Sequence, residues 1–378
     1  MASYKQVTKG NWKVTISLGT DLYGKRKKII KQGFRTKKEA ESYVTQVMDQ
    51  RDKGFVASVD SSILFKDYIT TWYEEYKQYN IGVNTRVGYL SRIKTNVIPL
   101  LGRYKLEQLN NQIIQNFYNT LISKKKHKPA TAKKNLDIVI SCLKYAKKNK
   151  LIYELPTDIE KQKLEKPEIK VWEKHHVEFF LEWIKGTYLY TPIFIDVLTG
   201  LRVSELCGLR WCDVDFDSGI ISVSNQLIYE TNTKVLFLGK LKTQSSNRKI
   251  TIPLVLIDYL KKLKKHRNAK NTDYIVLDRM GNAYNPKALS TNFSKKIKEF
   301  SKPVEEVEEK ENYMQLPKIT FHGLRHTHAT MLIANGENIK VVSQRLGHSD
   351  IRMTLNTYTH ILEDMNKNTA QLLDKMFG

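Results

Sequence analysis

The residues best suited to chemistry on a phosphate lie in the second half of the chain, within two short strings. The string FHGLRHTHAT places His322 and Arg325 three positions apart, and on a helix such residues share one face. An imidazole and a guanidinium could then reach the same phosphate group. The string TGLRVSEL puts Arg202 at a predicted helix start, with Glu205 one turn later to hold it. Because a helix N-terminus also attracts anions, Arg202 is predicted to bind a phosphate.

Three further positions supply a proton donor, a second imidazole and a nucleophile. Lys242 lies before the polar turn of a predicted hairpin, where a lysine can protonate a departing alkoxide. His348 follows a glycine that ends a predicted helix, and Tyr358 comes ten residues later. A phenol can bond covalently to phosphorus when a base or a positive field helps to remove its proton. Taken singly, each position also fits an ordinary structural role, and it is their order and spacing together that single them out.

The three histidines His322, His326 and His328 raise the alternative of a metal site. No Cys, Asp or Glu nearby completes a ligand set of the usual composition. We therefore interpret His326 and His328 as core or supporting residues, and we expect no metal in the site.

Composition indicates a polyanionic partner. The chain has 63 Lys and Arg against 39 Asp and Glu, which gives a net charge of +24. Nucleic acid is expected, because each Lys or Arg that neutralises a phosphate releases condensed counterions; a ribosomal or membrane-surface protein is the alternative. The three cysteines, expected as small buried residues, fit no disulfide or zinc pattern. The sequence shows no signal peptide and no apolar run of membrane length, so a soluble cytoplasmic protein is expected.

The first 54 residues predict a small basic module of three strands and one helix. Strand periodicity is seen in the alternating apolar residues Trp12, Val14, Ile16 and Leu18. A turn follows, residues 25–31 return as a second strand, and a third strand is placed at 32–35. The TKKE string then has capping-box spacing and begins a helix. The cationic strands are expected to contact DNA through Lys25, Arg26, Lys27 and Lys28.

Residues 62–155 predict a compact bundle of four amphipathic helices with short connections. The polar faces of the bundle favour DNA through the same-sign charges of Lys124, Lys125, Lys126, Lys133 and Lys134. A polar, proline-containing linker is expected over 155–170. Residues 170–378 predict a mixed, mainly helical domain with a β-rich patch, and the acidic insertion at 304–311 is expected to be an exposed loop.

The ordered set of Arg202, Lys242, His322 with Arg325, His348 and Tyr358 resembles the signature of the tyrosine recombinase, or phage integrase, family. The strings TGLRVSEL, FHGLRHTHAT and LGHSDIRMTLNTYTH match its motif boxes with every catalytic position filled. The helical bundle resembles the family's core-binding domain, and the N-terminal module resembles the arm-binding domain of integrases from temperate phages and conjugative transposons. The resemblance implies a multidomain tyrosine recombinase fold: a β3-α module, an all-α core-binding (SAM-like) bundle, and a mainly α catalytic domain with a small antiparallel sheet.

The resemblance also implies a reaction, the site-specific integration and excision of a mobile element by DNA strand exchange. Tyr358 would form a 3′-phosphotyrosine and release a 5′-hydroxyl protonated by Lys242, while Arg202 and Arg325 stabilise charge on the phosphate. One phosphoester replaces another, so no metal, nucleotide or other cofactor is expected. The implied partners are double-stranded DNA attachment sites, a homotetramer assembled on DNA, and excisionase and DNA-bending accessory proteins.

Three alternatives stay open at this point. Apolar residues near helical spacing in 361–377 fit packing on their own domain or on a neighbouring protomer, and the family resemblance favours the neighbour. A type IB topoisomerase-like or telomere-resolving enzyme shares the phosphotyrosine chemistry, although the N-terminal module favours an integrase. A DNA-binding regulator that has lost catalysis is the third alternative, and the filled motif boxes argue against it.

Overall fold

The computed structural model describes residues 2–20, 26–52, 63–163, 169–241, 246–301, 316–355, 357, 358, 374, 376 and 377, apart from the side chains at 18–20, 26, 27 and 50–52. Lys25, Lys242, the acidic segment 304–311 and nearly all of the segment 361–377 lie outside this description. The chain divides into two units, Met1–Lys166 and Pro167–Gly378. The first unit contains two separate hydrophobic clusters, one in the N-terminal module and one in the helical bundle.

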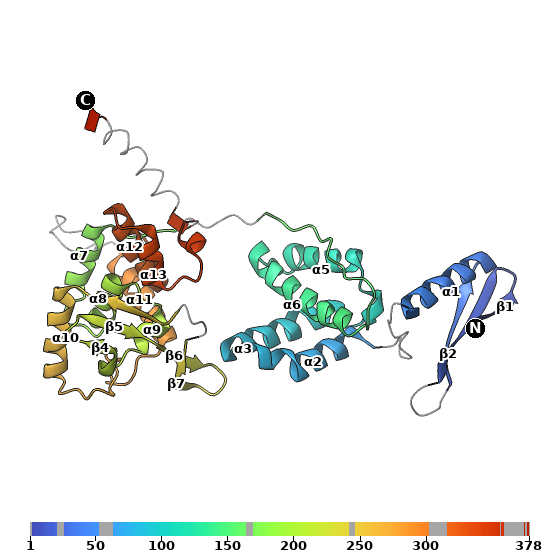
Figure 1. Cartoon of the computed structure of the whole chain (residues 1–378), viewed down its shortest axis with the longest axis horizontal. Helices are drawn as coiled ribbons and strands as arrows, with labels where there is room; N and C mark the ends of the chain where they lie inside the picture. Colours follow the sequence, from blue (N-terminus) through green and yellow to red (C-terminus); the bar gives the residue numbers. More distant parts are fainter. Residues whose placement is uncertain are drawn as a thin grey trace. The chain divides into compact units, whose positions relative to one another are not determined.

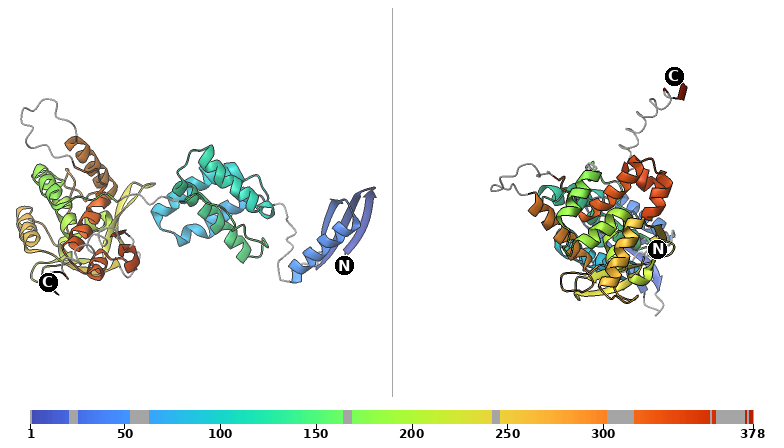
Figure 2. Two further views of the ribbon diagram at one scale, coloured as in Figure 1. Left: turned by 90° about the horizontal axis from the view of Figure 1, so that it is seen from above. Right: turned by 90° about the vertical axis from the view of Figure 1, so that its left-hand side faces the viewer.

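The N-terminal module is an antiparallel sheet covered on one face by a helix. Its strands β1 (Ala2–Thr8), β2 (Asn11–Thr20) and β3 (Arg26–Phe34) pair in the order β1-β2-β3. Helix α1 (Lys37–Asp52) lies along the sheet (Figure 2). The alternation in β2 fully buries Val14 and Ile16, which share a cluster with residues of α1 at Ala40, Val44 and Val47. A period of two on the strand and a near-period of four on the helix thus produce one common core.

The strand positions in this module differ from the prediction. Strand β1 was not predicted, and one continuous strand, β3, covers most of the stretch assigned to two strands at 25–31 and 32–35. β1 is an edge strand of which only Ala2 and Tyr4 are partly buried. An edge strand with so little buried surface carries almost no hydrophobic pattern for sequence analysis to detect.

The helical bundle is formed by α2 (Phe65–Glu75), α3 (Val83–Arg92), α4 (Ile98–Leu101), α5 (Asn111–Ser123) and α6 (Pro129–Lys148), with the short 3₁₀ helices η1 (Lys77–Asn80) and η3 (Leu106–Gln108). A π-helical turn, η2 (Ile93–Val97), joins α3 to α4. Helix α6 begins at Pro129 as the sequence predicts, because a proline fits the first helical position.

The bundle extends beyond residue 155 into the stretch predicted as a linker. Ile159 is buried in the bundle's hydrophobic cluster. The Gln115 side chain accepts from the backbone N–H of Glu160 at 2.8 Å and donates to its carbonyl at 3.1 Å. Residues up to about this point therefore belong to the bundle's packing.

The second unit combines helices with two small antiparallel sheets (Figure 1). Its helices are α7 (Lys174–Trp183), α8 (Tyr190–Thr199), α9 (Val203–Cys207), the 3₁₀ turn η4 (Trp211–Asp213), α10 (Leu254–His266), α11 (Pro286–Phe300), α12 (Phe321–Ala334) and α13 (Ile339–Leu346). One sheet has the order β4-β5-β8, from β4 (Val214–Asp215), β5 (Ile220–Val223) and β8 (Arg248–Thr251). The other is the hairpin of β6 (Asn225–Glu230) and β7 (Val235–Lys240).

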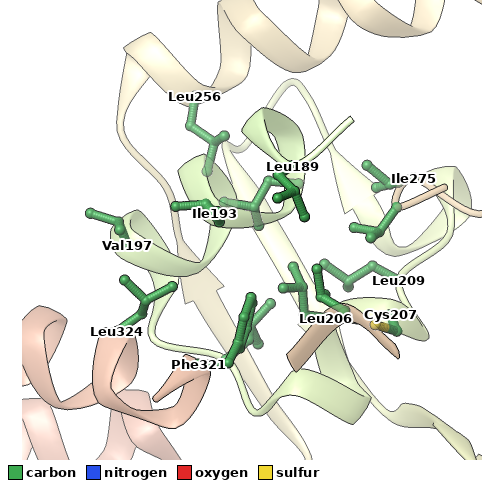
Figure 3. Close-up of a cluster of buried hydrophobic side chains, with 14 of the residues drawn as sticks. Leu189, Ile193, Val197, Leu206, Cys207, Leu209, Leu256, Ile275, Phe321 and Leu324 are labelled. Carbon is green, nitrogen blue, oxygen red and sulfur yellow. The ribbon is translucent and has the colours of Figure 1, made fainter. Parts of the chain in front are cut away.

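The core of this unit brings together the elements that carry the sequence motifs. Side chains from α8 and α12 face one another, with Val197 near Leu324 (Figure 3). Trp172, just before α7, is buried, and its indole N–H donates to the Pro317 carbonyl at 2.7 Å. Because α8, α9 and α12 share this core, the motif residues at their ends are held in a fixed relation.

Two smaller expectations are also tested by the fold. Cys142 and Cys207 are buried as predicted, whereas Cys212 is exposed. Among the helices that the structure describes, none combines the length and apolar character needed to span a bilayer.

Candidate active site

The end of helix α8 supplies the first fixed point of the site. Gly200 adopts a left-handed conformation with φ of 64°, and its N–H donates to the Asp196 carbonyl at 2.7 Å. A Cβ atom at this position would lie 2.6 Å from Cδ2 of His328, so glycine is required for packing as well as for backbone conformation. The chain therefore turns sharply out of α8 and delivers Arg202 to the start of α9.

The end of helix α13 supplies the second fixed point. Gly347 is left-handed with φ of 68°, its N–H donates to Gln344, and the N–H of His348 donates to Ser343. These two bonds form a Schellman motif, which places His348 in a defined position immediately after the helix. The motif leaves the carbonyls of the following residues, from Arg345 onward, without helical partners.

Three arginines donate hydrogen bonds to three consecutive carbonyls at this helix end, those of Arg345, Leu346 and Gly347. Arg248 Nε donates to Arg345 O at 2.7 Å, Arg325 Nη2 to Leu346 O at 2.6 Å, and Arg202 Nη2 to Gly347 O at 3.1 Å. The C-terminus of a helix carries partial negative charge, so it attracts guanidinium groups as well as accepting their hydrogen bonds. Arg325 also reaches the end of α8, where Nη1 donates to the Gly200 carbonyl at 2.7 Å.

Glu205 joins two of these arginines. Its Oε1 accepts from Arg202 Nη1 at 2.6 Å, and its Oε2 accepts from Arg248 Nη2 at 2.8 Å and from the Arg202 backbone N–H at 3.0 Å. Burial would raise the pKa of the Glu205 carboxyl, but the hydrogen bond and charge of Arg248, followed by those of Arg202, hold the pKa below its ordinary value. Glu205 is therefore an ionised group that holds both Arg202 and Arg248.

The guanidiniums of Arg202 and Arg325 keep donors for a further anion. The bonds described use two of the five N–H groups of each. Arg202 is the more accessible, with a side chain 37% exposed, whereas Arg325 is 2% exposed as a residue. Burial, and then the charges of Arg202 and Arg248, lower the pKa of Arg325 to about 10, so this guanidinium is still charged near neutral pH.

The two predicted histidines flank this cluster. His322 is exposed on the first turn of α12, and its pKa is lowered by desolvation and then by the charges of Arg325 and Arg202. His348 is half-buried, and its Nδ1 is hydrogen-bonded to Thr354 Oγ1 at 2.8 Å. Desolvation, and then the charges of Arg325 and Arg202, lower the pKa of His348 to about 4. Both side chains therefore share the field of the two arginines.

Tyr358 lies in the same unit, packed against its own α12 and α13. It is 1% exposed and belongs to a small hydrophobic cluster with Ala329, Ile333, Val342 and Leu346. Its hydroxyl is hydrogen-bonded to Nδ1 of His326 at 2.9 Å. Burial raises the pKa of Tyr358, and the charge of Arg325 partly opposes that rise. The candidate nucleophile is thus within the electrostatic reach of the arginine cluster.

The predicted DNA-contacting lysines fall into two groups. Lys125 Nζ donates to the Thr95 carbonyl at 2.6 Å, and Lys133 pairs with Asp137 at 2.9 Å, so both have partners within the bundle. Lys28, Lys124, Lys126 and Lys134 are exposed, as is Lys125 despite its hydrogen bond. Arg26 and Lys27 lie in β3, with side chains outside the described part of the chain. Strand β7 ends at Lys240, two residues before Lys242.

Several residues that support the site could not be singled out from the sequence. Arg248 and Arg345 are two of them. His328 is a core residue as interpreted: its Nδ1–H donates to the Val197 carbonyl at 2.8 Å, and its Nε2 accepts from Arg345 Nε at 3.0 Å. His326, interpreted in the same way, instead contacts Tyr358. In the described part of the chain, no three His, Cys, Asp or Glu side chains are grouped to hold a metal ion.

Comparison with known families decides the class of the protein. The model of the phage integrase family matches residues 173–365, more than half of the 378-residue chain. The chain belongs to the phage integrase family. It is therefore a tyrosine recombinase, a class of site-specific DNA recombinase. An arm DNA-binding domain model matches residues 2–50, and the model of the N-terminal SAM-like domain of phage integrases matches residues 64–122.

Individual relatives agree with this assignment. The tyrosine recombinase XerC-like protein of Caldanaerobacter subterraneus subsp. tengcongensis is 27% identical, over 99% of this chain and 98% of its own. The transposase from transposon Tn916 of Enterococcus faecalis is 31% identical, over 49% of this chain and 45% of its own. The integrase of transposon Tn1549, solved in complex with transposon right end DNA, is 25% identical with a TM-score of 0.70, over 82% of this chain and all of that one. The predicted tyrosine recombinase fold, and the predicted class of mobile-element recombinase, are confirmed.

Proposed function

We propose that this integrase cleaves duplex DNA by attack of Tyr358 on a backbone phosphate that Arg202 and Arg325 hold. The observation that supports this most directly is the arginine arrangement at the end of α13. Two guanidiniums from different segments are fixed by adjacent carbonyls, in the same electrostatic cluster as the phenol. Such a pair suits the non-bridging oxygens of a phosphate, because each guanidinium can donate two parallel hydrogen bonds.

Each remaining site residue has a proposed part in the same step. His322 and His348 donate hydrogen bonds to the phosphate, and Glu205 positions Arg202 through its two carboxylate oxygens. Lys242 protonates the leaving oxygen, a role taken from the family resemblance. By the same resemblance the products are a 3′-phosphotyrosine and a 5′-hydroxyl. The reaction exchanges one phosphoester for another, so it needs neither ATP nor a metal ion.

The two N-terminal parts of the chain are proposed to grip DNA. We assign residues 1–54 to arm-type DNA binding, 62–155 to core-site binding, and 170–378 to catalysis. In the bundle, Lys124, Lys125, Lys126 and Lys134 are exposed, but Lys125 and Lys133 already have protein partners. We therefore expect Lys124, Lys126 and Lys134 to contribute most to phosphate contact.

The assembly proposed is a homotetramer on two DNA attachment sites, in the cytoplasm where the chromosome lies. The segment 361–377, which precedes the C-terminus, is proposed to link neighbouring protomers. Excisionase and DNA-bending proteins are proposed as accessory partners, because they accompany integrases that carry an arm-binding domain. A truncation at residue 363 should then weaken cooperative DNA binding, and unchanged cooperativity would reject this role for the segment.

The proposal is tested by trapping the covalent intermediate. A core duplex is first selected from a randomised pool by binding to the full-length chain, and is then nicked at successive positions so that the cleaved end diffuses away. Wild type should accumulate a covalent protein–DNA adduct, and Tyr358→Phe should bind the duplex equally but form none. Tyr79→Phe, at a tyrosine 71% exposed in the bundle, is the matched control and should react like wild type. An adduct formed by Tyr358→Phe would overturn the assignment.

The same duplex separates the alternatives that the sequence left open. For Arg202→Ala and Arg325→Ala we expect cleavage to fall by the equivalent of about 3 kcal/mol or more with a smaller loss of binding, as for groups that stabilise transition-state charge. Strand exchange between two duplexes distinguishes a recombinase from a topoisomerase-like or telomere-resolving enzyme. A regulator without catalysis would bind the duplex and give no adduct.

A further inference from the structure

The side chain in contact with Tyr358, the candidate nucleophile, is His326, which is not one of the catalytic positions of the sequence motifs. His326 Nδ1 lies 2.9 Å from the Tyr358 hydroxyl, and the two rings meet edge-on with centroids 5.9 Å apart. His326 follows Arg325 on α12 and lies one turn after His322, whose ring centroid is 4.8 Å from its own. The imidazole that contacts the phenol is therefore the immediate sequence neighbour of Arg325 on α12.

We propose that His326 is a further catalytic residue of this integrase, which accepts the proton of Tyr358 at Nδ1 as the phosphotyrosine bond forms. This inference rests on the proposed role of Tyr358 as the nucleophile. It assigns His326 the tautomer with its proton on Nε2, so that Nδ1 accepts the hydrogen bond of the phenol.

Among the described histidines near the arginine cluster, His322, His328 and His348 are less well placed for this step. His348 has its Nδ1 engaged with Thr354 Oγ1, and His322 is exposed at the start of α12. His328, two residues beyond His326, has both ring nitrogens bonded on the opposite side of the helix. His326 is the histidine whose ring nitrogen is hydrogen-bonded to the phenol oxygen.

The electrostatics of the pair suit a proton that moves only during reaction. Burial, and then the charges of His322 and Arg325, lower the pKa of His326 to about 4, so its ring is neutral and can accept a proton. Burial raises the pKa of Tyr358, so the phenol does not ionise in the free enzyme. The phenol oxygen becomes strongly acidic only as its bond to phosphorus forms, and a weak base can then take the proton. A bound phosphate also offsets the positive charge of Arg325 beside His326 and so favours protonation of the His326 ring.

The step balances in both directions. During cleavage the phenol O–H bond breaks and an N–H bond forms at His326, while the phenol oxygen bonds to phosphorus and the bond from phosphorus to the 5′ oxygen breaks. The 5′ oxygen takes its proton from the general acid, for which Lys242 is the candidate. During rejoining the 5′-hydroxyl gives its proton back to that group, for which Lys242 is the candidate, and its oxygen bonds to phosphorus. The bond from phosphorus to the phenol oxygen breaks, and His326 returns its proton to the departing phenolate.

The test compares two replacements of His326 in the full-length chain on the nicked core duplex. His326→Asn keeps a polar group near the position of Nδ1 but cannot accept a proton near neutral pH. We expect its adduct formation to be about 10²- to 10⁴-fold slower than wild type, as for other lost general bases, with duplex binding within about twofold. Its rate should rise about tenfold per pH unit above neutral pH, where hydroxide can replace the missing base, while the wild-type rate stays level. His175→Asn, at an exposed histidine of α7, is the matched control and should behave like wild type.

A second variant keeps the result interpretable if the asparagine variant is unstable. His326→Ala should regain at least tenfold in rate when imidazole is added, because free imidazole can occupy the space and accept the proton. Adduct formation by His326→Asn within about threefold of wild type, or a pH profile parallel to that of wild type together with no imidazole rescue, would overturn the proposal. These outcomes are read only after Tyr358→Phe has abolished the adduct, so a failure at that earlier step is a failure of the proposed function and is recognised separately.

Discussion

Arg202 and Arg325 donate hydrogen bonds to the carbonyl oxygens of adjacent residues, Gly347 and Leu346, at the end of α13. The two guanidiniums come from segments more than a hundred residues apart, yet one peptide unit separates their anchors. Their spacing is therefore set by the backbone of a third segment. Residues that hold this backbone segment in place should therefore matter to the site as much as the two arginines do.

Arg248 should be essential for the stability of the site although it is not among the motif residues. It is buried, with a side chain 6% exposed, and it pairs with Glu205, whose side chain is 2% exposed. In Arg248→Met the Glu205 carboxylate loses its main partner and remains buried, so we expect a loss of about 3–5 kcal/mol in the free energy of unfolding. Urea unfolding of the full chain measures this loss.

Two variants serve as controls for Arg248→Met. Arg352→Met breaks the pair between Arg352 and Asp350, in which the arginine side chain is 80% exposed, and should change the free energy of unfolding little, because solvent screens the pair. Adding Glu205→Gln to Arg248→Met should recover part of the loss, because it removes the uncompensated charge. Equal costs for Arg248→Met and Arg352→Met would contradict the pairing described here.

The second unit, Pro167–Gly378, should lose stability in mild acid, because burial lowers the pKa of histidines such as His328. Burial, and then the charge of Arg345, lower the pKa of His328 to about 4 from its ordinary 6.5. A base with a lowered folded-state pKa stabilises the fold above its unfolded pKa, and this contribution is lost as the pH falls from about 6.5 to about 4. His328 alone should contribute about 3 kcal/mol to this loss.

The contribution of His328 is isolated by His328→Asn, which does not titrate in this range. We expect this variant to be less stable near neutral pH, since the bonds to Val197 and Arg345 are disturbed. The slope of its unfolding free energy against pH should be smaller than that of wild type, by the equivalent of up to one bound proton. Amide hydrogen exchange in α12, measured at a series of pH values, reports both effects, and an unchanged slope would argue against a neutral buried His328.

Asp196 should destabilise the fold at neutral pH. It is fully buried in α8, and neither carboxyl oxygen has a hydrogen-bond partner among the described residues. Burial raises its pKa well above the ordinary value, although the charge of Arg325 opposes the rise. An acid with a raised folded-state pKa stabilises the fold below its unfolded pKa, and this contribution is lost as the pH rises toward the folded value.

Replacing Asp196 by a residue that cannot ionise should therefore stabilise the protein selectively. Asp196→Asn is expected to raise the thermal midpoint near neutral pH and to change it little at a pH well below the ordinary value of 3.8, where the wild-type carboxyl is protonated in both states. Asp258→Asn, at an exposed position of α10, should show no such pH-dependent gain. A gain for Asp196→Asn that is the same at both pH values would point to packing instead of ionisation.

The left-handed turn at Gly200 should be intolerant of a side chain for two separable reasons. In Gly200→Ala, φ of 64° costs about 1 kcal/mol, and the new Cβ would approach His328 Cδ2 at 2.6 Å. Gly186→Ala has a similar φ of 76° but nothing within 4 Å of the added atom, so it measures the backbone cost alone. We expect Gly200→Ala to exceed Gly186→Ala by about 1–3 kcal/mol in urea unfolding, as overpacking does. Equal costs would show that His328 moves aside freely.

Much of the fold was predictable because its patterns are strong. The amphipathic helices of the bundle and the alternation in β2 each bury the residues that their periodicity selects. Proline at the start of α6 and the left-handed glycine at the end of α13 mark boundaries by backbone geometry alone. The edge strand β1 was missed because so few of its side chains are buried, and Ile159 was assigned to a linker because one buried residue makes no pattern.

The site was predictable in its motif residues but not in the contacts between them. The spacing of His326 and His328 places them about 200° apart around a helix, so they must face different surroundings. Spacing cannot say which of the two faces Tyr358, because that depends on how α12 packs against α13. Arg248 and Arg345 were given no role for the same reason, since their hydrogen bonds to Glu205 and Thr251 join segments separated by 43 and 94 residues.

The Schellman turn at Gly347 fixes the proposed chemical centre without any residue of the two modules that are proposed to grip DNA. Its backbone carbonyls hold the guanidiniums in place before any substrate arrives, so little reorganisation is required when an oxyanion enters. The N-terminal modules, in contrast, have hydrophobic cores of their own. If the proposed roles hold, new DNA target preferences can therefore arise by exchanging those modules, with no change in the residues proposed for catalysis.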